Sequence, residues 1–431
     1  MCAYRSAHER AKRQKRLDDL CNAVLIDNYR WDSDRSHLLA KIHERVSKEF
    51  DNPSPEEAER VEGMKAKNLQ FCSRQIKRHY NGESFVRVGD NVREKDVHLF
   101  FKFKLPKDPL LAEESAKQNE GSIVDSYLIQ LCVTLDGLMR SGVNSITLYA
   151  PFLPYLRQDK KDDGRVPISA KMLFNLFDAA AAKKLLRRIV TFDLHADQEQ
   201  GFWDGPVDAL TASPDFAAYY RERLSRENGY KASDFANYVE VVAADAGGVK
   251  RTDKMARLLK CPWDVFTKLR EAHSEADTRL DVRHNIKGKK LIIAEDIIDT
   301  CGSIAGKAEV DPGGPKEGPL QYLIGLGAEA HCCATHGVFS AKNGLTAEER
   351  LRQSGGKILI ADTLQERDAG YYQENRDWLT VVSLDYVLAK AFFCNQVGDS
   401  ISGFLSKRGE RVKAEKLDFK IVSEGARYTV A

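Results

Sequence analysis

Short apolar runs rich in β-branched residues alternate with amphipathic stretches over most of the chain after about residue 79. Each run has the length and composition of a buried strand, whereas intervening stretches such as 169–182 and 249–260 carry apolar positions at helical spacing. The runs are residues 97–103, 145–151, 188–194, 239–245, 290–296, 330–338, 357–362 and 379–384. Alternating strands and helices predict parallel sheets flanked by helices. The number of strands fits two such α/β units in tandem, joined near residue 212.

The first 72 residues have a different pattern. They are polar and highly charged, and apolar residues such as Leu38, Ile42 and Val46 recur at helical spacing. A helical extension is therefore expected, with a break where Asn-Pro-Ser-Pro occupies positions 52–55. The predicted division of the chain is a helical extension over residues 1–72, α/β domains over 73–212 and 213–410, and a tail over 411–431.

Composition narrows the class of protein without naming a reaction. Hydrophobic residues make up 42% of the chain and charged residues 30%, which is typical of a soluble globular protein. No apolar run approaches the roughly 18–20 residues that span a bilayer, and the basic start lacks the apolar segment of a secretory signal. The formal net charge of +2 favours neither nucleic acid nor a membrane as a partner. The nine cysteines imply no disulfide framework, so a cytoplasmic location is expected.

The run KLIIAED (290–296) ends in two acids and is followed at once by IIDTCGS. In an open parallel sheet, ligands bind beyond the carboxyl ends of the strands. Two adjacent carboxylates suit the vicinal hydroxyls of a ribose, because charged acceptors make strong hydrogen bonds. The D-T-x-G-S stretch can wrap a phosphate with backbone N–H groups and hydroxyls. An acid pair alone would favour an ordinary solvated turn, whereas the full pattern is typical of phosphoribosyl-binding proteins and leaves the reaction open.

Three further stretches indicate the reaction. PYLRQDKKDDGRVPISAK (154–171) surrounds a turn with basic residues, and FDLHADQEQGFWDGPVD (192–208) places His195 just past a strand. AADAGGVKR (243–251) joins a strand to a helix through Asp, Gly and Gly. In order and wording, these stretches and EDIIDTCGS resemble the ribose-phosphate pyrophosphokinases from about residue 79 to 407. The resemblance implies an α/β fold of two tandem phosphoribosyltransferase-like domains with parallel sheets flanked by helices, here preceded by the helical extension.

The resemblance also implies a reaction and a set of site residues. The anomeric hydroxyl of ribose 5-phosphate attacks the β-phosphorus of MgATP, giving phosphoribosyl pyrophosphate and AMP, with Mg²⁺ as cofactor. The residues implied in ATP binding are Asn81, Glu83, Arg157, Gln158, Asp162 and His195, with His195 and Asp245 at the metal. Those implied in ribose 5-phosphate binding are Glu295, Asp296, Asp299, Thr300, Cys301, Gly302 and Ser303, while Asp245, Gly247 and Gly248 serve the diphosphate. Lys268 and Arg270, on the family's mobile loop, are the implied catalytic cations.

The chain departs from the family's usual pattern at several positions. Glu295 stands where the family usually has Asp, Ser303 where it has Thr, and Leu269 where a third basic residue is usual. His79 replaces the aromatic residue that stacks on adenine. In the family this turn reaches into a neighbouring subunit's site, so the match of the residues that follow His79 implies a homo-oligomer whose adenine site lies at a subunit interface.

Two other functions stay open at this point. A catalytically silent subunit that associates with true synthetases would share the fold while altering the catalytic loop, and the retained cations and acids favour an active enzyme instead. A phosphoribosyltransferase would share the ribose loop, but the RQDKKDDGR stretch disfavours it. Inserts near residues 105–120 and 309–320 and the N-terminal 72 residues have no expected family counterpart, so neither the usual hexamer nor its regulation is implied. His336, in a family-like stretch, is assigned a structural role.

Overall fold

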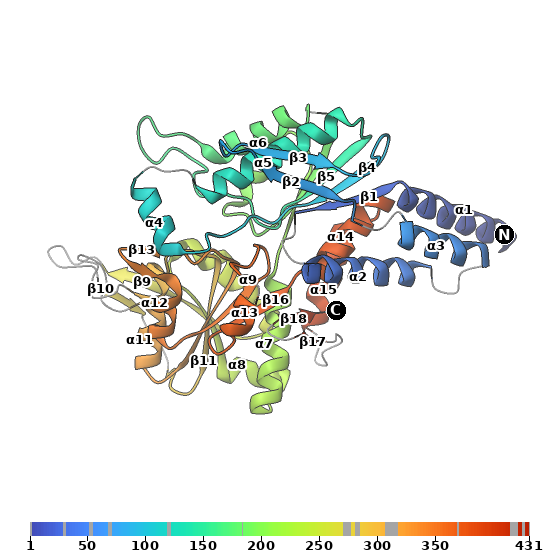
Figure 1. Cartoon of the computed structure of the whole chain (residues 1–431). Coiled ribbons are helices and arrows are strands. Elements are labelled where there is room, and N and C mark those ends of the chain that lie inside the picture. The colour runs from blue at the N-terminus through green and yellow to red at the C-terminus, as the bar shows by residue number, and fades with distance from the viewer. Residues whose placement is uncertain are drawn as a thin grey trace. The chain divides into compact units, whose positions relative to one another are not determined.

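The chain folds into two compact units (Figure 1). Unit 1 comprises Met1–Phe103, Val124–Leu210 and Asp385–Phe404, and unit 2 comprises Lys104–Ile123, Thr211–Leu384 and Leu405–Ala431. The computed structural model describes residues 2–28, 32–50, 55–67, 71–118, 122–182, 184–269, 277–280, 285–306, 318–368, 370–413, 421–424 and 427–430. The domain boundaries expected from the sequence stay predictions.

Unit 1 is built on a five-stranded parallel sheet with the order β1-β4-β5-β6-β7. Its strands are β1 (Ala23–Asp27), β4 (Asp96–Phe100), β5 (Ser145–Tyr149), β6 (Leu186–Phe192) and β7 (Val207–Leu210). Parallel neighbours need crossover connections. They are supplied by α5 (Ile123–Arg140) between β4 and β5 and by α6 (Ser169–Ala180) between β5 and β6. The predicted strands over 97–103, 145–151 and 188–194 and the helix over 169–182 are confirmed.

The N-terminal extension is helical except for one strand. Its helices are α1 (Cys2–Cys21), α2 (Asp32–Glu49) and α3 (Pro55–Lys67), and the break expected at 52–55 falls mostly on residues outside the described ranges. Residues 23–27, however, form β1, which pairs in parallel with β4. β1 was not predicted, because the run AVLID is too short for its periodicity to separate a strand from a helix. Leu25 and Ile26 are fully buried, so the extension contributes to the core of unit 1.

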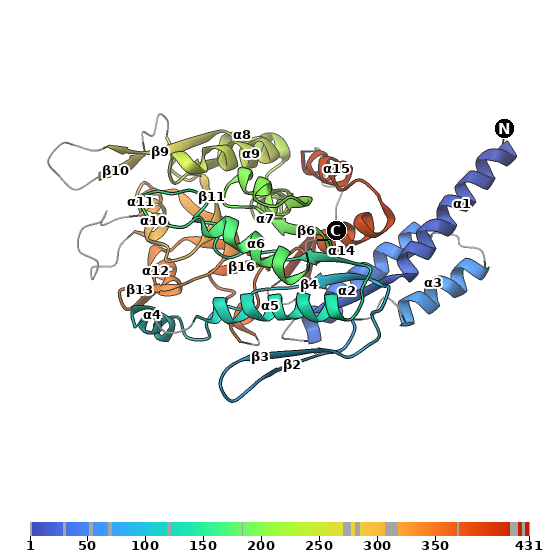
Figure 2. The same ribbon diagram turned by 90° about the horizontal axis from the view of Figure 1, so that it is seen from above.

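Two further segments of unit 1 are distinctive. Helix α14 (Asp385–Val397) packs against α2, where the Arg45 guanidinium carbon lies 4.2 Å from the centre of the Phe393 ring. An antiparallel hairpin of β2 (Arg74–Arg78) and β3 (Ser84–Val88) precedes β4, and its side chains are exposed or half-buried. Figure 2 shows the hairpin extending as a narrow ribbon. A two-stranded hairpin of this kind has marginal stability by itself.

Unit 2 is built on a nine-stranded sheet with the order β10-β9-β8-β11-β12-β15-β16-β18-β17. Its strands are β8 (Val239–Ala243), β9 (Trp263–Leu269), β10 (Asp277–Leu280), β11 (Lys290–Ile298), β12 (Glu329–Gly337), β15 (Lys357–Ala361), β16 (Leu379–Ser383), β17 (Ile421–Glu424) and β18 (Arg427–Val430). All neighbours are parallel except the two outermost pairs, β9 with β10 and β17 with β18. The five strands predicted between residues 239 and 384 are confirmed.

The order of the strands places a switch point between β8 and β11. After β8 the chain continues through α9 (Val249–Leu259) to β9 on one side of β8, and it later returns to β11 on the other side. The predicted helix over 249–260 is therefore confirmed. In open α/β sheets, ligands bind where the connections that follow two neighbouring strands run in opposite directions along the sheet. The carboxyl ends of β8 and β11 are thus the position in unit 2 where a ligand is expected.

The inserts and the C-terminal tail, for which no helices or strands were predicted, contain helices and strands in the structure. In the insert near 105–120, α4 (Pro109–Lys117) follows a capping Asp108, and in the second insert only residues 318–320, at the start of α11 (Pro319–Gly325), lie in the described part. The tail over 411–431 contributes β17 and β18, which extend the sheet beside β16. A small hairpin of β13 (Ala341–Lys342) and β14 (Leu345–Thr346) precedes α12 (Ala347–Ser354).

Candidate active site

The acid pair lies inside β11, which continues two residues further than predicted. The side chains of Glu295 and Asp296 are 17% and 9% exposed. Arg251 of α9 lies against both carboxylates, with Nη1 3.5 Å from Glu295 Oε2 and Nη2 3.4 Å from Asp296 Oδ1. One guanidinium therefore orients the two acids. No role was predicted for Arg251, and its only sequence signal is the basic start of the helix after Gly-Gly.

Like charges gather at the ends of β8 and β11. Burial raises the pKa of Glu295 to about 7, Arg251 opposes this shift, and the neighbouring carboxylates of Asp296 and Asp245 add to it. Near neutral pH, Glu295 therefore exists both as a carboxylate that accepts hydrogen bonds and as an acid that can donate one. A cation or a hydroxyl donor arriving here would favour the ionised form.

Asp245 follows β8 and caps the short 3₁₀ turn η3 (Ala246–Gly248). Its Oδ1 accepts the backbone N–H groups of Gly247 at 2.9 Å and Gly248 at 3.3 Å. A Cβ added at Gly247 would lie 3.1 Å from this oxygen, so a side chain there would require the Asp245 carboxylate to shift by a few tenths of an ångström. The two N–H groups predicted for the diphosphate are thus engaged by Asp245.

The predicted phosphate loop, residues 299–303, follows β11 directly. Cys301 has a φ of 63° and is buried, while Ser303 is exposed and Asp299 and Thr300 are half-buried. The Cys301 carbonyl accepts the N–H groups of Ile304 and Ala305, which starts α10 (Gly302–Ala305). Burial raises the pKa of the Cys301 thiol well above its usual value, so this thiol is unreactive.

The predicted ATP residues belong to unit 1. Arg157, Gln158 and Asp162 lie on an exposed turn between β5 and α6. The Gln158 side-chain oxygen accepts the Ser169 hydroxyl at 2.6 Å, and its carbonyl accepts the N–H of Ala170 at 3.3 Å. Gln158 therefore ties this turn to the first residues of α6. Asp162 lies 3.8 Å from Lys160 in a fully solvated pair, which contributes little to stability.

His195 lies just beyond β6, as predicted, with its side chain exposed. The chain turns sharply before it, since Asp193 has a φ of 33° and donates its N–H to the Leu210 carbonyl at 2.9 Å. Gln198 Nε2 donates to Asp159 Oδ2 at 2.9 Å. This bond joins the DLHADQ segment to the RQDKKD turn, so two of the predicted ATP segments come together within unit 1.

The structure describes the predicted adenine-binding turn, but only part of the predicted catalytic loop. Asn81 lies at the tip of the β2–β3 hairpin, where its side-chain oxygen accepts the N–H of Glu83 at 3.2 Å. The His79 ring packs edge-on against Phe85, with centroids 6.0 Å apart. Lys268 lies within β9, opposite Thr278 of β10, and Arg270 lies outside the described residues.

Three acidic side chains lie near one another at the ends of β8 and β11. Carboxylate oxygens are the ligands that Mg²⁺ prefers, and the charges of Asp245, Glu295 and Asp296 are close enough to raise the pKa of Glu295. His195, the other predicted ligand, belongs to unit 1, whereas these acids belong to unit 2. Within the described ranges, however, no three His, Cys, Asp or Glu side chains are grouped so that they could hold a metal ion. Nor does any helix there have the length and apolarity to cross a membrane.

Two α/β units, with an acid pair and a D-T-C-G-S loop at the switch point of one of them, define a protein of the phosphoribosyl-binding class. Residues 37–181 match the model of the N-terminal domain of ribose phosphate pyrophosphokinase. Residues 37–72 and the insert near 105–120, expected to lack a family counterpart, lie inside the matched range. The chain is 33% identical to a ribose-phosphate pyrophosphokinase of Aquifex aeolicus over 76% of this chain and 88% of that one. It is likewise 33% identical to the Thermotoga maritima enzyme, over 75% and 87% of the two chains.

The fold is similar to that of a phosphoribosylpyrophosphate synthetase from Mycobacterium smegmatis, whose crystal structure matches with a TM-score of 0.60 and 28% identity. That match covers 87% of this chain and 98% of the other. The chain therefore belongs to the ribose-phosphate pyrophosphokinase family.

Proposed function

We propose that this protein is a ribose-phosphate diphosphokinase, which transfers the β,γ-diphosphoryl group of ATP to the C1 hydroxyl of ribose 5-phosphate. The products are phosphoribosyl pyrophosphate and AMP. One observation carries the proposal: the carboxylates of Asp245, Glu295 and Asp296 gather at the switch point of the sheet, directly before the loop of residues 299–303. Family membership adds the reaction to this ligand geometry.

Ribose 5-phosphate would be held at both of its ends. Glu295 and Asp296, oriented by Arg251, accept the 2′ and 3′ hydroxyls, and the ionised form of Glu295 is the better acceptor. The 5-phosphate binds the loop of residues 299–303, where the hydroxyls of Thr300 and Ser303 supply donors. Gly302 adds its backbone N–H without a side chain in the way. Contacts at both ends would thus fix the orientation of the substrate.

On the nucleotide side, Arg157, Gln158, Asp162 and His195 bind ATP. Asp245 and His195 would hold Mg²⁺, which when bound draws negative charge from the phosphate oxygens. Lys268 and Arg270 neutralise the charge that spreads over the transferred diphosphoryl oxygens, so the protein's contribution is positioning and electrostatics. The leaving group is AMP.

The exposed β2–β3 hairpin favours an assembly of several copies. Its tip carries Asn81 and Glu83, which are assigned to adenine, and Tyr80 there is fully exposed. A hairpin of marginal stability gains order by contact with a second copy of the chain. The adenine site would then lie at a subunit interface, and the assembly would work in the cytoplasm.

The deciding experiment is an assay of AMP release by the pure protein with ATP, Mg²⁺ and ribose 5-phosphate. Phosphoribosyl pyrophosphate and AMP are expected in equal amounts, with no AMP when ribose 5-phosphate is left out. Absence of AMP at every concentration of inorganic phosphate tested would instead identify a catalytically silent subunit. A chelator of divalent cations is expected to abolish the activity, and added Mg²⁺ to restore it.

A further inference from the structure

The insert between β4 and α5 folds as part of unit 2. Its helix α4 is held by Glu113, whose carboxylate accepts the backbone N–H groups of Asn343 at 2.7 Å and Gly344 at 3.1 Å. These two residues form the turn between β13 and β14 with φ values of 55° and 76°. Two consecutive positive φ values are typical of a tight two-residue turn. The carboxylate of Glu113 therefore accepts two N–H groups whose positions the turn fixes.

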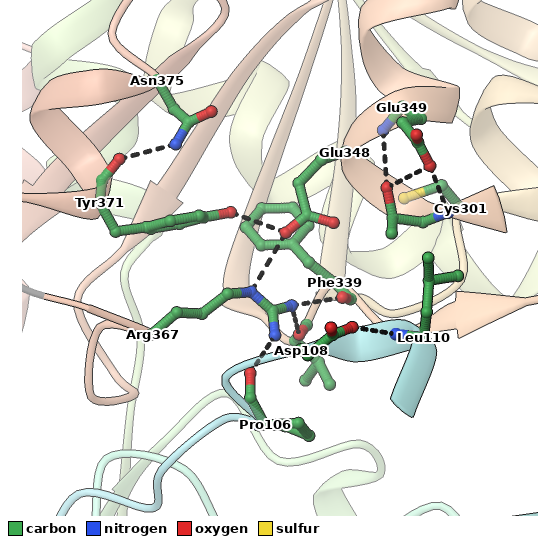
Figure 3. A network of polar contacts seen from close by, with 12 residues as sticks. Pro106, Asp108, Leu110, Cys301, Phe339, Glu348, Glu349, Arg367, Tyr371 and Asn375 are labelled. Atoms are coloured by element: carbon green, nitrogen blue, oxygen red, sulfur yellow. Dashed lines mark hydrogen bonds and ion pairs between the residues drawn. The ribbon is translucent and has the colours of Figure 1, made fainter. Parts of the chain in front are cut away.

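Arg367 connects the start of the same insert to the end of β12 (Figure 3). It is 4% exposed, and its Nη1 donates to the carbonyl of Pro106. Its Nη2 donates to the carbonyls of Val338, at 3.1 Å, and Phe339. Nε donates to Glu348 at 3.1 Å, so the buried charge is balanced.

The turn that Arg367 holds is bonded to the start of the phosphate loop. The N–H groups of Val338 and Phe339 donate to the Ile298 carbonyl at 2.8 and 3.1 Å, and Ser340 donates to the Asp299 carbonyl at 3.2 Å. Phe339 has a φ of 53°, a left-handed conformation that a bulky residue adopts only when its surroundings impose it. Arg367 therefore binds the carbonyl groups of a strained turn whose N–H groups bind the start of the phosphate loop.

From these contacts we propose that residues 104–118 and Arg367 form a brace that sets the shape of the ribose 5-phosphate loop. Arg367 is then a positioning residue: it touches no substrate and acts through the turn at 338–340. The inference rests on the proposed function, which assigns residues 299–303 to the 5-phosphate. Without the guanidinium, the carbonyls of Val338 and Phe339 lose their donor, and the turn relaxes together with the backbone of Asp299.

Three variants test the brace: Arg367→Met removes it, Arg367→Lys keeps a cation in place, and Glu113→Gln weakens the grip on α4. Arg367→Met is expected to raise the KM for ribose 5-phosphate about tenfold while the KM for ATP stays within about twofold. Arg367→Lys should restore part of the affinity, and Glu113→Gln should give a smaller change of the same kind. Arg226→Lys is the matched control, since Arg226 lies on α7 (Ser213–Asn228) of the same unit, where its exposed guanidinium pairs with Glu222 at 3.2 Å.

Calorimetric titration of the wild type and each variant with ribose 5-phosphate alone separates the possible outcomes. A wild type that neither binds ribose 5-phosphate nor releases AMP overturns the proposed function and the brace with it. An active wild type whose Arg367 and Glu113 variants keep the wild-type affinity overturns the brace alone. Equal rises in both KM values, or the same loss in Arg226→Lys, also overturn it. Should Arg367→Met fail to fold by circular dichroism, Glu113→Gln carries the test, because glutamine keeps the size of the side chain and α4 contains no buried residue.

Discussion

Glu295 carries one methylene more than the aspartate usual in the family, and its carboxylate lies among charges that oppose its ionisation. Arg251 is the cation placed to offset Asp296 and Asp245 at this point. The balance leaves the pKa of Glu295 at about 7, so small electrostatic changes alter its charge near neutral pH. The affinity for ribose 5-phosphate should therefore depend on pH more steeply near neutrality than the affinity for ATP.

The titration of Glu295 also has a consequence for stability. The pKa of its carboxyl rises from 4.5 to about 7 on folding, so the folded protein binds more protons than the unfolded chain between these values. The free energy of unfolding from this group therefore falls as pH rises from about 4.5 to 7, by up to about 3 kcal/mol. Glu295→Gln should be more stable than the wild type at pH 8 and equal to it near pH 4.5, in urea unfolding at both values. Glu83→Gln, on the exposed hairpin, is the control, and an unchanged stability of Glu295→Gln at pH 8 would contradict the prediction.

Lys268 is the residue whose loss should affect the reaction most selectively. Lys268→Ala is expected to lower kcat by about 10²–10⁴-fold, because the charge of the transferred group loses a cation that matters most in the transition state. ATP binding, measured by titration of the protein with the nucleotide, should stay nearly unchanged. Lys254→Ala, an exposed lysine on α9, is the matched control. Wild-type turnover in Lys268→Ala would remove the residue from the mechanism.

At the scale of elements, the eight strands predicted from apolar runs all exist, because each run is buried in the middle of a sheet. Among the strands that were not predicted, β1, β7 and β17 have five residues or fewer and lie at the ends of the sheets. A strand of only a few residues with one polar face has too little hydrophobic periodicity to be recognised from the sequence. Sheet edges, unlike sheet centres, are decided by tertiary pairing.

In the candidate site, too, local features could be predicted from the sequence and tertiary contacts could not. The acid pair and the D-T-C-G-S stretch were predictable because their residues are adjacent in the chain and their chemistry is local. The partners that orient them were not predictable. Arg251 reaches Glu295 across 44 positions, and Arg367 reaches Pro106 across 261. Contacts of this range come from the fold and leave no local signal.

β1 should matter to the stability of unit 1 despite its position in the charged extension. Leu25 is fully buried beside β4, so Leu25→Ala is expected to lower the free energy of unfolding by about 2–5 kcal/mol. Val24, which is only half-buried, provides the matched control in Val24→Ala. Thermal unfolding of both variants measures the difference. Equal behaviour of the two would mean that β1 does not contribute to the core.

At the scale of the whole molecule, the proposed adenine site at a subunit interface predicts how mixed assemblies behave. If the hairpin serves a neighbouring copy as proposed, Glu83→Ala is expected to be nearly inactive because it damages the neighbour's site, and Lys268→Ala because it damages the loop of its own copy. When the two inactive variants are mixed and allowed to exchange subunits, some sites receive an intact hairpin and an intact loop, and activity should return. No recovery, with exchange verified by a tag on one variant, would contradict an interface site.

The packing of α14 on α2 has a consequence for how the protein is made. Unit 1 begins at the start of the chain, yet it includes Asp385–Phe404, and residues 211–384 are synthesised in between. At roughly 5–20 residues per second, the ribosome needs about 9–35 seconds to cover that gap. During this time the buried face of α2, with Leu38, Ile42 and Val46, has no α14 to cover it. The nascent chain therefore exposes an apolar helix face until residues 385–397 have been synthesised, and we expect chaperones that bind apolar segments to recognise it at the ribosome.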